Sequence, residues 1–562
     1  MSFRRFDLEK ISAGVFFLLA TWVGVSLLRW IWLYWNVLPF WDQWTFLAEY
    51  AELRSSLHPR WLEFLLGQHN EHRIFVARLF LIADLEFFGG GNKSLILENL
   101  LVQLLTWAAL CWLVLAHLRS LFSRIAVLSF AFLVLFSAGQ VDNFIWGFQI
   151  QFVGVYAAAI FACLSAVRGW NIRAGCFATV ATLMMANGVF VWPVLMIIAL
   201  LQKRSRFVAI AYGAGFLVCL GAYLVGYKSV AGHSSLSYAL AHPLQFFEYL
   251  LIYLGGFASA GNMNVAIFFG GIELIFLGIL VLHAWRRRDF QVREFWAFLG
   301  VAAFVLGSAL LTTAGRLSFG ADQALAGRYV TPSSILLVCV VFGWLCRVRK
   351  VEANGFRYIV TPDAYISYFA VLAVAFIGVN HWHHRDDLIG RHQRLNIASD
   401  AIAVDARDSR AYGMAFSDMH LITKASDWLK TRNLSIFSTH PWSMLGSKIG
   451  VDIPIAPDAR CVGNIDVVKP VSSGDGNLAT SVRGWGWDRH GQIKPSAVLL
   501  VDAANRVTGF ASEEVARADV ALTLGLSKAS MAGWAGFNAN GTPVAAYGLI
   551  EGATLACKLS RL

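Results

Sequence analysis

The sequence predicts a polytopic α-helical membrane protein with about eleven spans and a C-terminal β-sandwich domain. Of its 562 residues, 57% are hydrophobic and only 14% are charged, and the mean hydropathy is +0.58. Soluble globular chains carry nearer a quarter charged residues, so a disordered protein and an ordinary cytosolic enzyme are both excluded. The net charge of +11 comes from basic residues at the ends of apolar segments. This placement argues against a nucleic-acid partner.

The apolar segments set the predicted number of spans. A helix needs about 20 apolar residues to cross a bilayer, and fewer where the membrane is locally thinned. Eleven segments meet this condition: Ile11–Leu33, Ser94–His117, Ile125–Gly139, Phe152–Val167, Ala174–Asn187, Phe190–Leu201, Phe207–Tyr227, Asn264–Trp285, Phe295–Thr313, Thr331–Cys346 and Ala364–Asn380. The two that flank Asn187 are short, and half-helices or tilted pieces are the alternative there.

Basic residues predict the orientation of these segments. Lys and Arg gather at the N-terminus and in every second loop, whereas the short loops between them hold only Lys228, Arg316 and Arg328. Because cytoplasmic loops carry the positive excess, the N-terminus is predicted inside and the region after residue 380 outside. Ile11–Leu33 is too long for a cleaved signal segment and is predicted to be a retained anchor.

Two further apolar stretches are too short or too charged for spans. Ile74–Phe88 and Pro243–Ser259 are interrupted by acidic residues. We expect both to form amphipathic helices at the outer interface. The first belongs to a long outer loop over residues 34–93.

Asp42 is the first candidate catalytic residue. It follows the first span and lies between Trp41 and Trp44, whose rings limit access of water. A carboxylate in this position suits a general base that takes a proton from an attacking hydroxyl. The alternative is an interfacial residue that caps the next helix.

Arg316, Arg328 and Tyr329 form the second candidate group. The two arginines are twelve residues apart in a loop that is nearly free of other cations. Guanidinium groups hold phosphate oxygens in a two-pronged geometry. A phosphate site is therefore predicted; the alternatives are anchoring of span ends and pairing with Asp322.

The first outer loop also contains His69, Glu71 and His72. These types position polar substrates or bind a divalent cation. The chain has no DxD or HExxH pattern, so no metal is predicted and a cation remains the alternative. In the second outer loop, Asn143, Trp146 and Gln149 combine amides with an aromatic ring, as sugar sites do; a plain interfacial turn is equally compatible.

The C-terminal region divides into a connector over residues 381–452 and a sandwich over 453–562. The connector is predicted to contain helices over 385–410 and 418–431 and a strand over Leu434–Phe437. The sandwich is predicted from short alternating strands separated by Gly and Asn turns, namely Ser481–Trp487, Ala497–Val501, Val507–Phe510 and Ala545–Ile550. Its Trp485, Trp487 and Trp534 suit either a carbohydrate site or the sandwich core, and we favour the core for at least one of the first two. Cys461 and Cys557 bracket this domain and are predicted to form a disulfide in an oxidising compartment.

The pattern resembles the GT-C superfamily of membrane glycosyltransferases. The resemblance covers roughly residues 11–380 and rests on an Asp at the outer end of the first span, a long first outer loop, about eleven spans and an outer C-terminal domain. Three sequence motifs also carry the resemblance: residues 143–149, Ala186-Asn187-Gly188, and Arg316–Gly320 followed by Arg328-Tyr329. These motifs look like those of bacterial members from surface polysaccharide loci.

This resemblance implies a periplasmic active site in the bacterial inner membrane and a polyprenyl-phosphate sugar donor. It further implies that Asp42 is the catalytic base and that basic residues hold the donor phosphate. Many relatives carry paired acids in the first loop, whereas Gln43 follows Asp42 here, which weakens the expectation of metal dependence. Glu71 is the nearest candidate for a second acid, and Gln43 becomes a candidate substrate-binding residue.

The sequence therefore predicts an inverting transferase that moves a sugar to a glycan or lipid acceptor. A transporter or flippase of lipid-linked sugars is an alternative, although its polar residues would be expected at mid-membrane rather than at one face. A third hypothesis is a polysaccharide polymerase or ligase, which shares this chemistry but uses a lipid-linked oligosaccharide.

Overall fold

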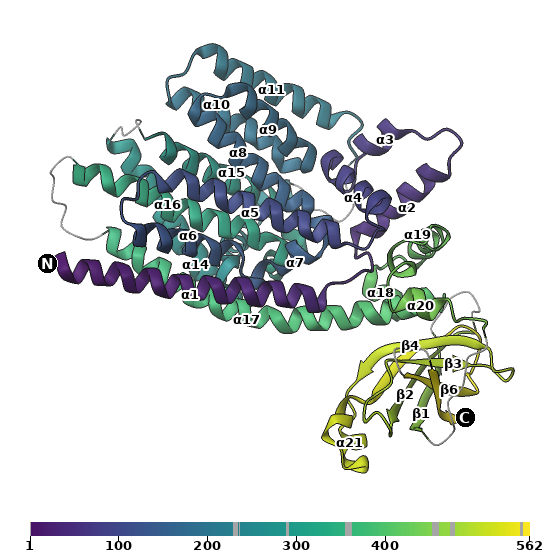
Figure 1. The fold of residues 1–562 in the computed structure, drawn as a ribbon. Helices are drawn as coiled ribbons and strands as arrows, with labels where there is room; N and C mark the ends of the chain where they lie inside the picture. Colours follow the sequence, from purple (N-terminus) through teal and green to yellow (C-terminus); the bar gives the residue numbers. More distant parts are fainter. Residues whose placement is uncertain are drawn as a thin grey trace. The chain divides into compact units, whose positions relative to one another are not determined.

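A computed structural model describes residues 2–228, 234, 236–287, 292–353, 362–451, 460–471, 478–550 and 555–561. The chain is mostly helical and has a sheet near its C-terminus (Figure 1). It divides into two compact units. The helical unit comprises residues 1–33, 65–81 and 95–388, and the sheet-bearing unit comprises residues 34–64, 82–94 and 389–562. The first outer loop is thus shared between the two units, a division that differs from the predicted boundaries.

In the described part of the chain, eight helices are long and apolar enough to cross a membrane. They are α1 (Ser2–Tyr34), α5 (Lys93–Leu115), α6 (Leu121–Leu135), α8 (Ile150–Arg168), α11 (Arg206–Leu224), α14 (Met263–Arg287), α15 (Arg293–Arg316) and α16 (Val330–Ala353). Each corresponds to one of the predicted spans. A multi-pass membrane protein is consistent with this set.

Three predicted spans are not among these eight. Two correspond to α9 (Asn171–Met184) and α10 (Val191–Leu201), which have 14 and 11 residues and flank the short 3-10 helix η3 (Ala186–Phe190). The third is the first part of α17 (Pro362–Ala403), a helix of 42 residues. No proline follows Pro362 in this helix, so the last predicted span and the helix predicted after it form one element. Eleven spans remain a prediction.

Glycines allow close packing inside the helical unit. Helix α13 (Pro243–Gly255), one of the two predicted amphipathic helices, contacts α14 where both backbones approach. A Cβ at Gly255 would lie 1.9 Å from the Ala266 carbonyl oxygen, and one at Gly270 would lie 2.1 Å from the Leu251 carbonyl oxygen. Small residues at such crossings are typical of helices that pack in membranes.

In the sheet-bearing unit, part of the first outer loop packs on the connector. Helix α19 (Met419–Thr431) corresponds to the helix predicted over 418–431, and it begins after Asp418, whose side chain caps it. It contacts α2 (Asp42–Ser55) through the rings of Tyr50 and Trp428, which lie 5.7 Å apart. The apolar residues of α2 are buried there, which explains why this loop segment belongs to the sheet-bearing unit.

The strand predicted over Leu434–Phe437 is wrong. This segment is a 3-10 helix, η8 (Ser435–Phe437). The Ser435 backbone N–H donates to the Gly89 carbonyl at 2.8 Å, and its hydroxyl donates to the Val37 carbonyl at 3.1 Å. Because these four residues have no partner strand, their backbone groups cannot pair in a sheet, and Ser435 bonds to the first outer loop instead. The described connector is therefore helical rather than mixed. Its remaining elements are α18 (Ser409–Ala415) and α20 (Trp442–Gly446).

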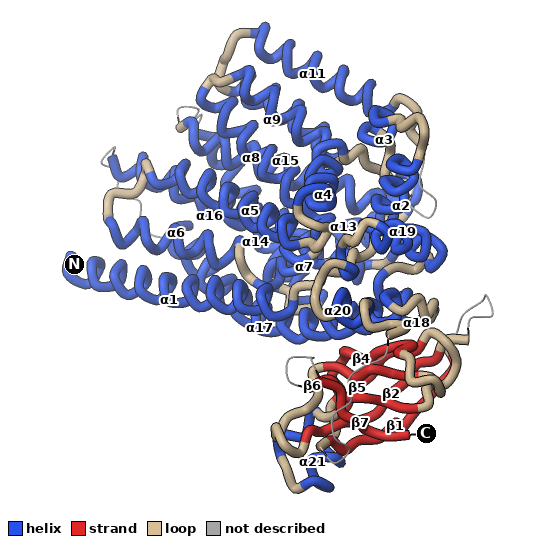
Figure 2. The backbone as a smooth tube through the Cα atoms, turned by 45° about the vertical axis from the view of Figure 1, so that its right-hand side comes forward, coloured by secondary structure: helices blue, strands red, loops and turns tan. Residues whose placement is uncertain are grey.

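The C-terminal domain is one antiparallel seven-stranded sheet in the order β1-β2-β5-β4-β3-β6-β7 (Figure 2). The strands are β1 (Cys461–Pro470), β2 (Thr480–Asp488), β3 (Ala497–Val501), β4 (Val507–Val515), β5 (Gly533–Asn538), β6 (Ala545–Ile550) and β7 (Leu555–Arg561). A helix, α21 (Ala518–Leu524), follows β4. Four of these strands match predicted ones.

The predicted sandwich of two packed sheets is replaced by a single curved sheet. A Cβ at Gly486 in β2 would lie 2.7 Å from Leu559 in β7, although β2 and β7 are five places apart in the strand order. Glycine therefore lets one end of the sheet fold onto the other. The predicted disulfide between Cys461 and Cys557 is present, with 5.7 Å between the Cα atoms, and joins the two edge strands.

Tryptophans fill the core of this domain. Trp487 is 3% exposed and Trp534 is 5% exposed, each within a cluster of buried apolar side chains. Rings buried in this way cannot stack on a sugar. Trp485 is half-buried against the same cluster as Trp487, as its position on the same strand face predicts.

Candidate functional site

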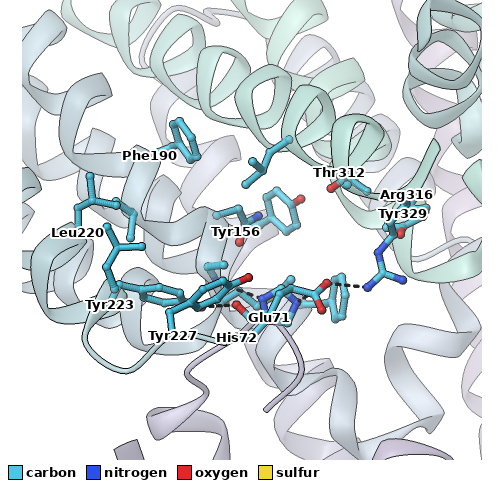
Figure 3. Close-up of a pocket in the computed structure, with 18 of the residues that line it drawn as sticks. Glu71, His72, Tyr156, Phe190, Leu220, Tyr223, Tyr227, Thr312, Arg316 and Tyr329 are labelled. Carbon is cyan, nitrogen blue, oxygen red and sulfur yellow. Dashed lines mark hydrogen bonds and ion pairs between the residues drawn. The ribbon is translucent and has the colours of Figure 1, made fainter. Parts of the chain in front are cut away.

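A cavity of about 700 Å³ lies within the helical unit (Figure 3). One part of its wall is apolar and comes from α8, η3, α11 and α15, including Phe152, Phe190, Leu220 and Leu311. The other part is polar and carries Glu71, His72, Tyr223, Tyr227, Arg316 and Tyr329. The cavity therefore has the two kinds of surface that an amphiphilic ligand requires.

An ion pair occupies the polar part of the cavity. Arg316, the last residue of α15, donates from Nη2 to Oε1 of Glu71 at 2.7 Å. The same oxygen lies 3.4 Å from Nε2 of His72. Burial by itself raises the pKa of Glu71, but His72 and Arg316 outweigh it and lower the pKa to about 2. Glu71 is therefore ionised at neutral pH and holds the guanidinium of Arg316 at the cavity wall (Figure 3).

The loop that carries Glu71 is a tight turn anchored to α11. The backbones of His69 and His72 exchange two hydrogen bonds of 2.7 and 2.9 Å, and Asn70 at the turn has φ of 48°. Tyr223 donates its hydroxyl to the Glu71 carbonyl at 2.9 Å and accepts from the Arg73 N–H at 3.0 Å. This turn fixes the backbone beside the acid.

His69 is not exposed in the cavity. It is 4% exposed and packs on the Phe148 ring at 5.0 Å, and burial lowers its pKa to about 3. It is therefore neutral at physiological pH. Within the described residues, no group of three His, Cys, Asp or Glu side chains is arranged to hold a metal ion.

Hydroxyl groups form a chain along another part of the wall. The Tyr156 hydroxyl lies 3.2 Å from that of Tyr253 and donates to Ser308 at 3.3 Å. Asn187 donates its amide to the same serine. The ring of Tyr329 lies 4.8 Å from that of Tyr253 and is 3% exposed. Tyr329 thus reaches the cavity as part of a packed aromatic wall.

Arg328 is not among the residues that line this cavity. Its guanidinium lies 5.2 Å from the Tyr329 ring. Asn143 is fully buried and donates to the backbone carbonyls of Gly327 and Arg328, both at 3.3 Å, and to Thr331 Oγ1 at 2.7 Å. Asn143 therefore fixes the turn that carries Arg328, rather than facing a solvent-filled site.

The other two members of the predicted sugar site differ from each other. Gln149 is 0% exposed, whereas Trp146 is half-buried and its ring stacks on Phe148 at an interplanar angle of 25°, with 6.3 Å between ring centroids. Both belong to the segment of α7 (Val141–Ile145) and η2 (Gly147–Gln149). Neither lines the cavity described above.

Asp42 and Gln43 belong to the sheet-bearing unit. Asp42 is half-buried and is the first residue of α2, so it is not the N-cap, a position that Trp41 occupies. Gln43 is buried and donates to Asn92 Oδ1 at 2.8 Å. This hydrogen bond joins the start and the end of the first outer loop, next to Asp42.

Sequence reasoning did not single out Tyr156, Asn187 or Tyr223 as site residues. Tyr156 and Tyr223 lie inside apolar spans, where a polar side chain is a signal of function. Asn187 stands between the two short helices, where a broken helix leaves backbone and side chain free to line a cavity.

Comparisons with family profiles, with curated proteins and with solved structures find no match for this chain.

Proposed function

We propose that this chain is an inverting glycosyltransferase with a GT-C-like architecture. It moves a sugar from a polyprenyl-phosphate donor to a glycan or lipid acceptor at the periplasmic face of the bacterial inner membrane. The observation that carries this proposal is the cavity of the helical unit, whose apolar wall suits a lipid chain and whose polar wall presents Arg316.

Arg316 is the proposed partner of the donor phosphate. A guanidinium held by one carboxylate keeps further N–H groups for other oxygens. Stabilising the phosphate as it leaves lowers the barrier without a covalent intermediate. Glu71, predicted as a second acid, is proposed to position Arg316, because their ion pair uses its carboxylate.

Asp42 is the proposed general base. It would take the proton of the acceptor hydroxyl while that oxygen attacks the anomeric carbon and the phosphate departs with its electron pair. A single displacement of this kind inverts the anomeric centre. Arg328 does not line the cavity and is left out of the proposed phosphate site.

The test is glycan and lipid profiling of a deletion strain of the host bacterium, complemented with single variants. We expect the deletion to remove one sugar from a surface polymer and to accumulate its polyprenyl-phosphate form. Arg316→Gln and Asp42→Asn should fail to restore the polymer, whereas Arg432→Gln, an exposed arginine in the connector, should restore it.

The alternatives give different outcomes. If the chain is a transporter, the purified protein will not transfer label from a polyprenyl-phosphate sugar. If it is a polymerase or ligase, its deletion will change the length of the polymer rather than its sugar content. Wild-type activity of Asp42→Asn would remove Asp42 from the mechanism.

A further inference from the structure

The sheet-bearing unit contains its own cavity, of about 380 Å³, which the proposed donor site does not include. It is lined by Phe40, Trp41, Arg391, Arg394, Leu395, Arg410, Gly413 and Met414. Three of the eight side chains are arginines, and none is acidic. The arginines come from α17 and α18, and the two aromatic residues precede α2.

The arginines are placed to bind an anion. Arg391 and Arg394 are three residues apart on α17 and so share one face of the helix, and the Arg391 guanidinium lies 5.0 Å from the Phe40 ring. Arg394 and Arg410 are exposed. Among the residues that the structure describes, neither forms a hydrogen bond or an ion pair.

Two acids close to Arg410 in the sequence are engaged elsewhere. Asp405 pairs with Arg407 at 3.0 Å, and Asp408 accepts from the Ala411 N–H at 2.7 Å and caps α18. No acidic side chain lines the cavity, and within the described residues Arg394 and Arg410 have no ion-pair partner, so these two guanidinium groups are available to an anion. A phosphate, with several oxygens for several guanidinium groups, is the anion that such a cluster fits.

Trp41 adds a flat apolar surface to this cavity. Its backbone has φ of 49° and ψ of −123°, a conformation that bulky residues rarely adopt. The Trp41 N–H donates to the Ala415 carbonyl at 2.9 Å, which ties this residue to the end of α18. Trp41 as a whole is 52% exposed. Strained residues of this kind concentrate where a side chain must be presented to a ligand.

We propose that this cavity binds a phosphate-bearing saccharide, with the phosphate on Arg391, Arg394 and Arg410 and the sugar ring on Trp41. The volume lies near the lower end of the range for small-molecule sites. It suits one sugar ring with one phosphate better than a nucleotide, which has a second ring.

This inference does not depend on the proposed transfer, because binding is measured without it. If the transfer also holds, the ligand is the acceptor, since Asp42 directly follows Trp41 in the chain. The proposed function thereby gains a chemical class for its acceptor, a phosphorylated glycan.

The experiment uses isothermal titration calorimetry of the full chain in phosphatidylcholine nanodiscs. The probes are glucose 1-phosphate, galactose 1-phosphate and N-acetylglucosamine 1-phosphate, compared with the neutral sugars, inorganic phosphate and uridine monophosphate. The variants are Arg394→Gln with Arg410→Gln, Trp41→Gly, and the control Arg432→Gln, whose guanidinium lies on the Trp428 ring at 5.4 Å outside the cavity. Glycine at position 41 accepts positive φ, so the backbone is preserved while the ring is removed.

We expect at least one sugar phosphate to bind at least about tenfold more tightly than inorganic phosphate or the neutral sugar. The double arginine variant should weaken binding by about tenfold or more, Trp41→Gly should reduce it to the level of inorganic phosphate, and Arg432→Gln should leave it unchanged. Absence of saturable binding by every sugar phosphate would overturn the proposal, as would an equal loss in Arg432→Gln or tighter binding of uridine monophosphate. Nanodiscs with phosphatidylglycerol provide the last arm: if this lipid blocks the sugar phosphates through the same arginines, a lipid headgroup is the ligand and the saccharide assignment fails.

Discussion

Replacing Glu71 with Gln should destabilise the helical unit and free Arg316. The ordinary pKa of 4.5 falls to about 2 in the folded protein. Because one pKa unit corresponds to about 1.4 kcal/mol, the folded site favours the ionised carboxylate by about 3 kcal/mol. Since the Glu71 side chain is only 19% exposed, solvent screening reduces this value little.

The sign of the pH dependence follows from the lowered pKa. The stabilisation is fully present well above pH 4.5, where the carboxylate is ionised even in the unfolded chain, declines below that pH as the unfolded chain takes up a proton, and is lost as the pH falls through about 2. The contribution of the pair should therefore be nearly the same at pH 7 and at pH 5 and should fall steeply only in more acidic solution.

A double-mutant cycle measures this interaction. Thermal unfolding of detergent-solubilised wild type, Glu71→Gln, Arg316→Gln and the double variant should give a coupling free energy of about 1.5–3 kcal/mol, the range for hydrogen bonds between charged groups. The control cycle uses the exposed pair of Arg60 and Glu63, whose side chains are 82% and 70% exposed, and should give well under about 1 kcal/mol. A coupling at Glu71 no larger than in this control would refute the assignment of Glu71 as the residue that holds Arg316.

Three further predictions concern stability. Cys461→Ser with Cys557→Ser should lower the free energy of unfolding of the sheet domain by about 2–5 kcal/mol, because the bridge closes a sequence separation of 96 residues; an unchanged melting temperature in reductant would contradict this. Gly255→Ala should destabilise by about 1–3 kcal/mol because its Cβ would lie 1.9 Å from a carbonyl oxygen, whereas Gly307→Ala, which meets no atom within 4 Å, should be neutral or stabilising in the same thermal assay. Burial raises the pKa of Asp400 to about 7 against the opposing hydrogen bonds from Ser512 and Trp442. Its contribution to stability should therefore decline between about pH 4 and pH 7, and Asp400→Asn should flatten that part of the stability profile; an unaltered profile would show that Asp400 does not titrate there.

Local patterns in the sequence were enough to predict the elements that depend on local physics. Eight apolar segments became long helices because length and composition alone specify such elements. Strands β3 and β6 were placed residue by residue, since short apolar runs between turn residues are typical of buried strands. The Cys461 and Cys557 pair followed from their position at the two ends of one domain.

Long-range pairing was beyond such patterns. Nothing local in residues 434–437 shows that Ser435 bonds to the backbone of the first outer loop rather than to a strand. The same limit applies to the candidate site: His69, Glu71 and His72 were grouped by proximity in sequence, yet only Glu71 and His72 line the cavity, with Arg316 from 245 positions further on. Tertiary packing decides which neighbouring polar residues face the same space.

The curved sheet has a consequence for the border of the domain. Strand β1 pairs with β2 on one side; on its other side it contacts β7, the opposite edge strand, but the described residues of these two strands form no β-ladder. The outer backbone groups of β1 are therefore a place where another chain can pair. Its irregular pairing between Ile465 and Val467, together with the exposed Lys469 and Pro470, makes this border a poor template. The amino acids of β1 thus oppose edge-to-edge aggregation of the domain.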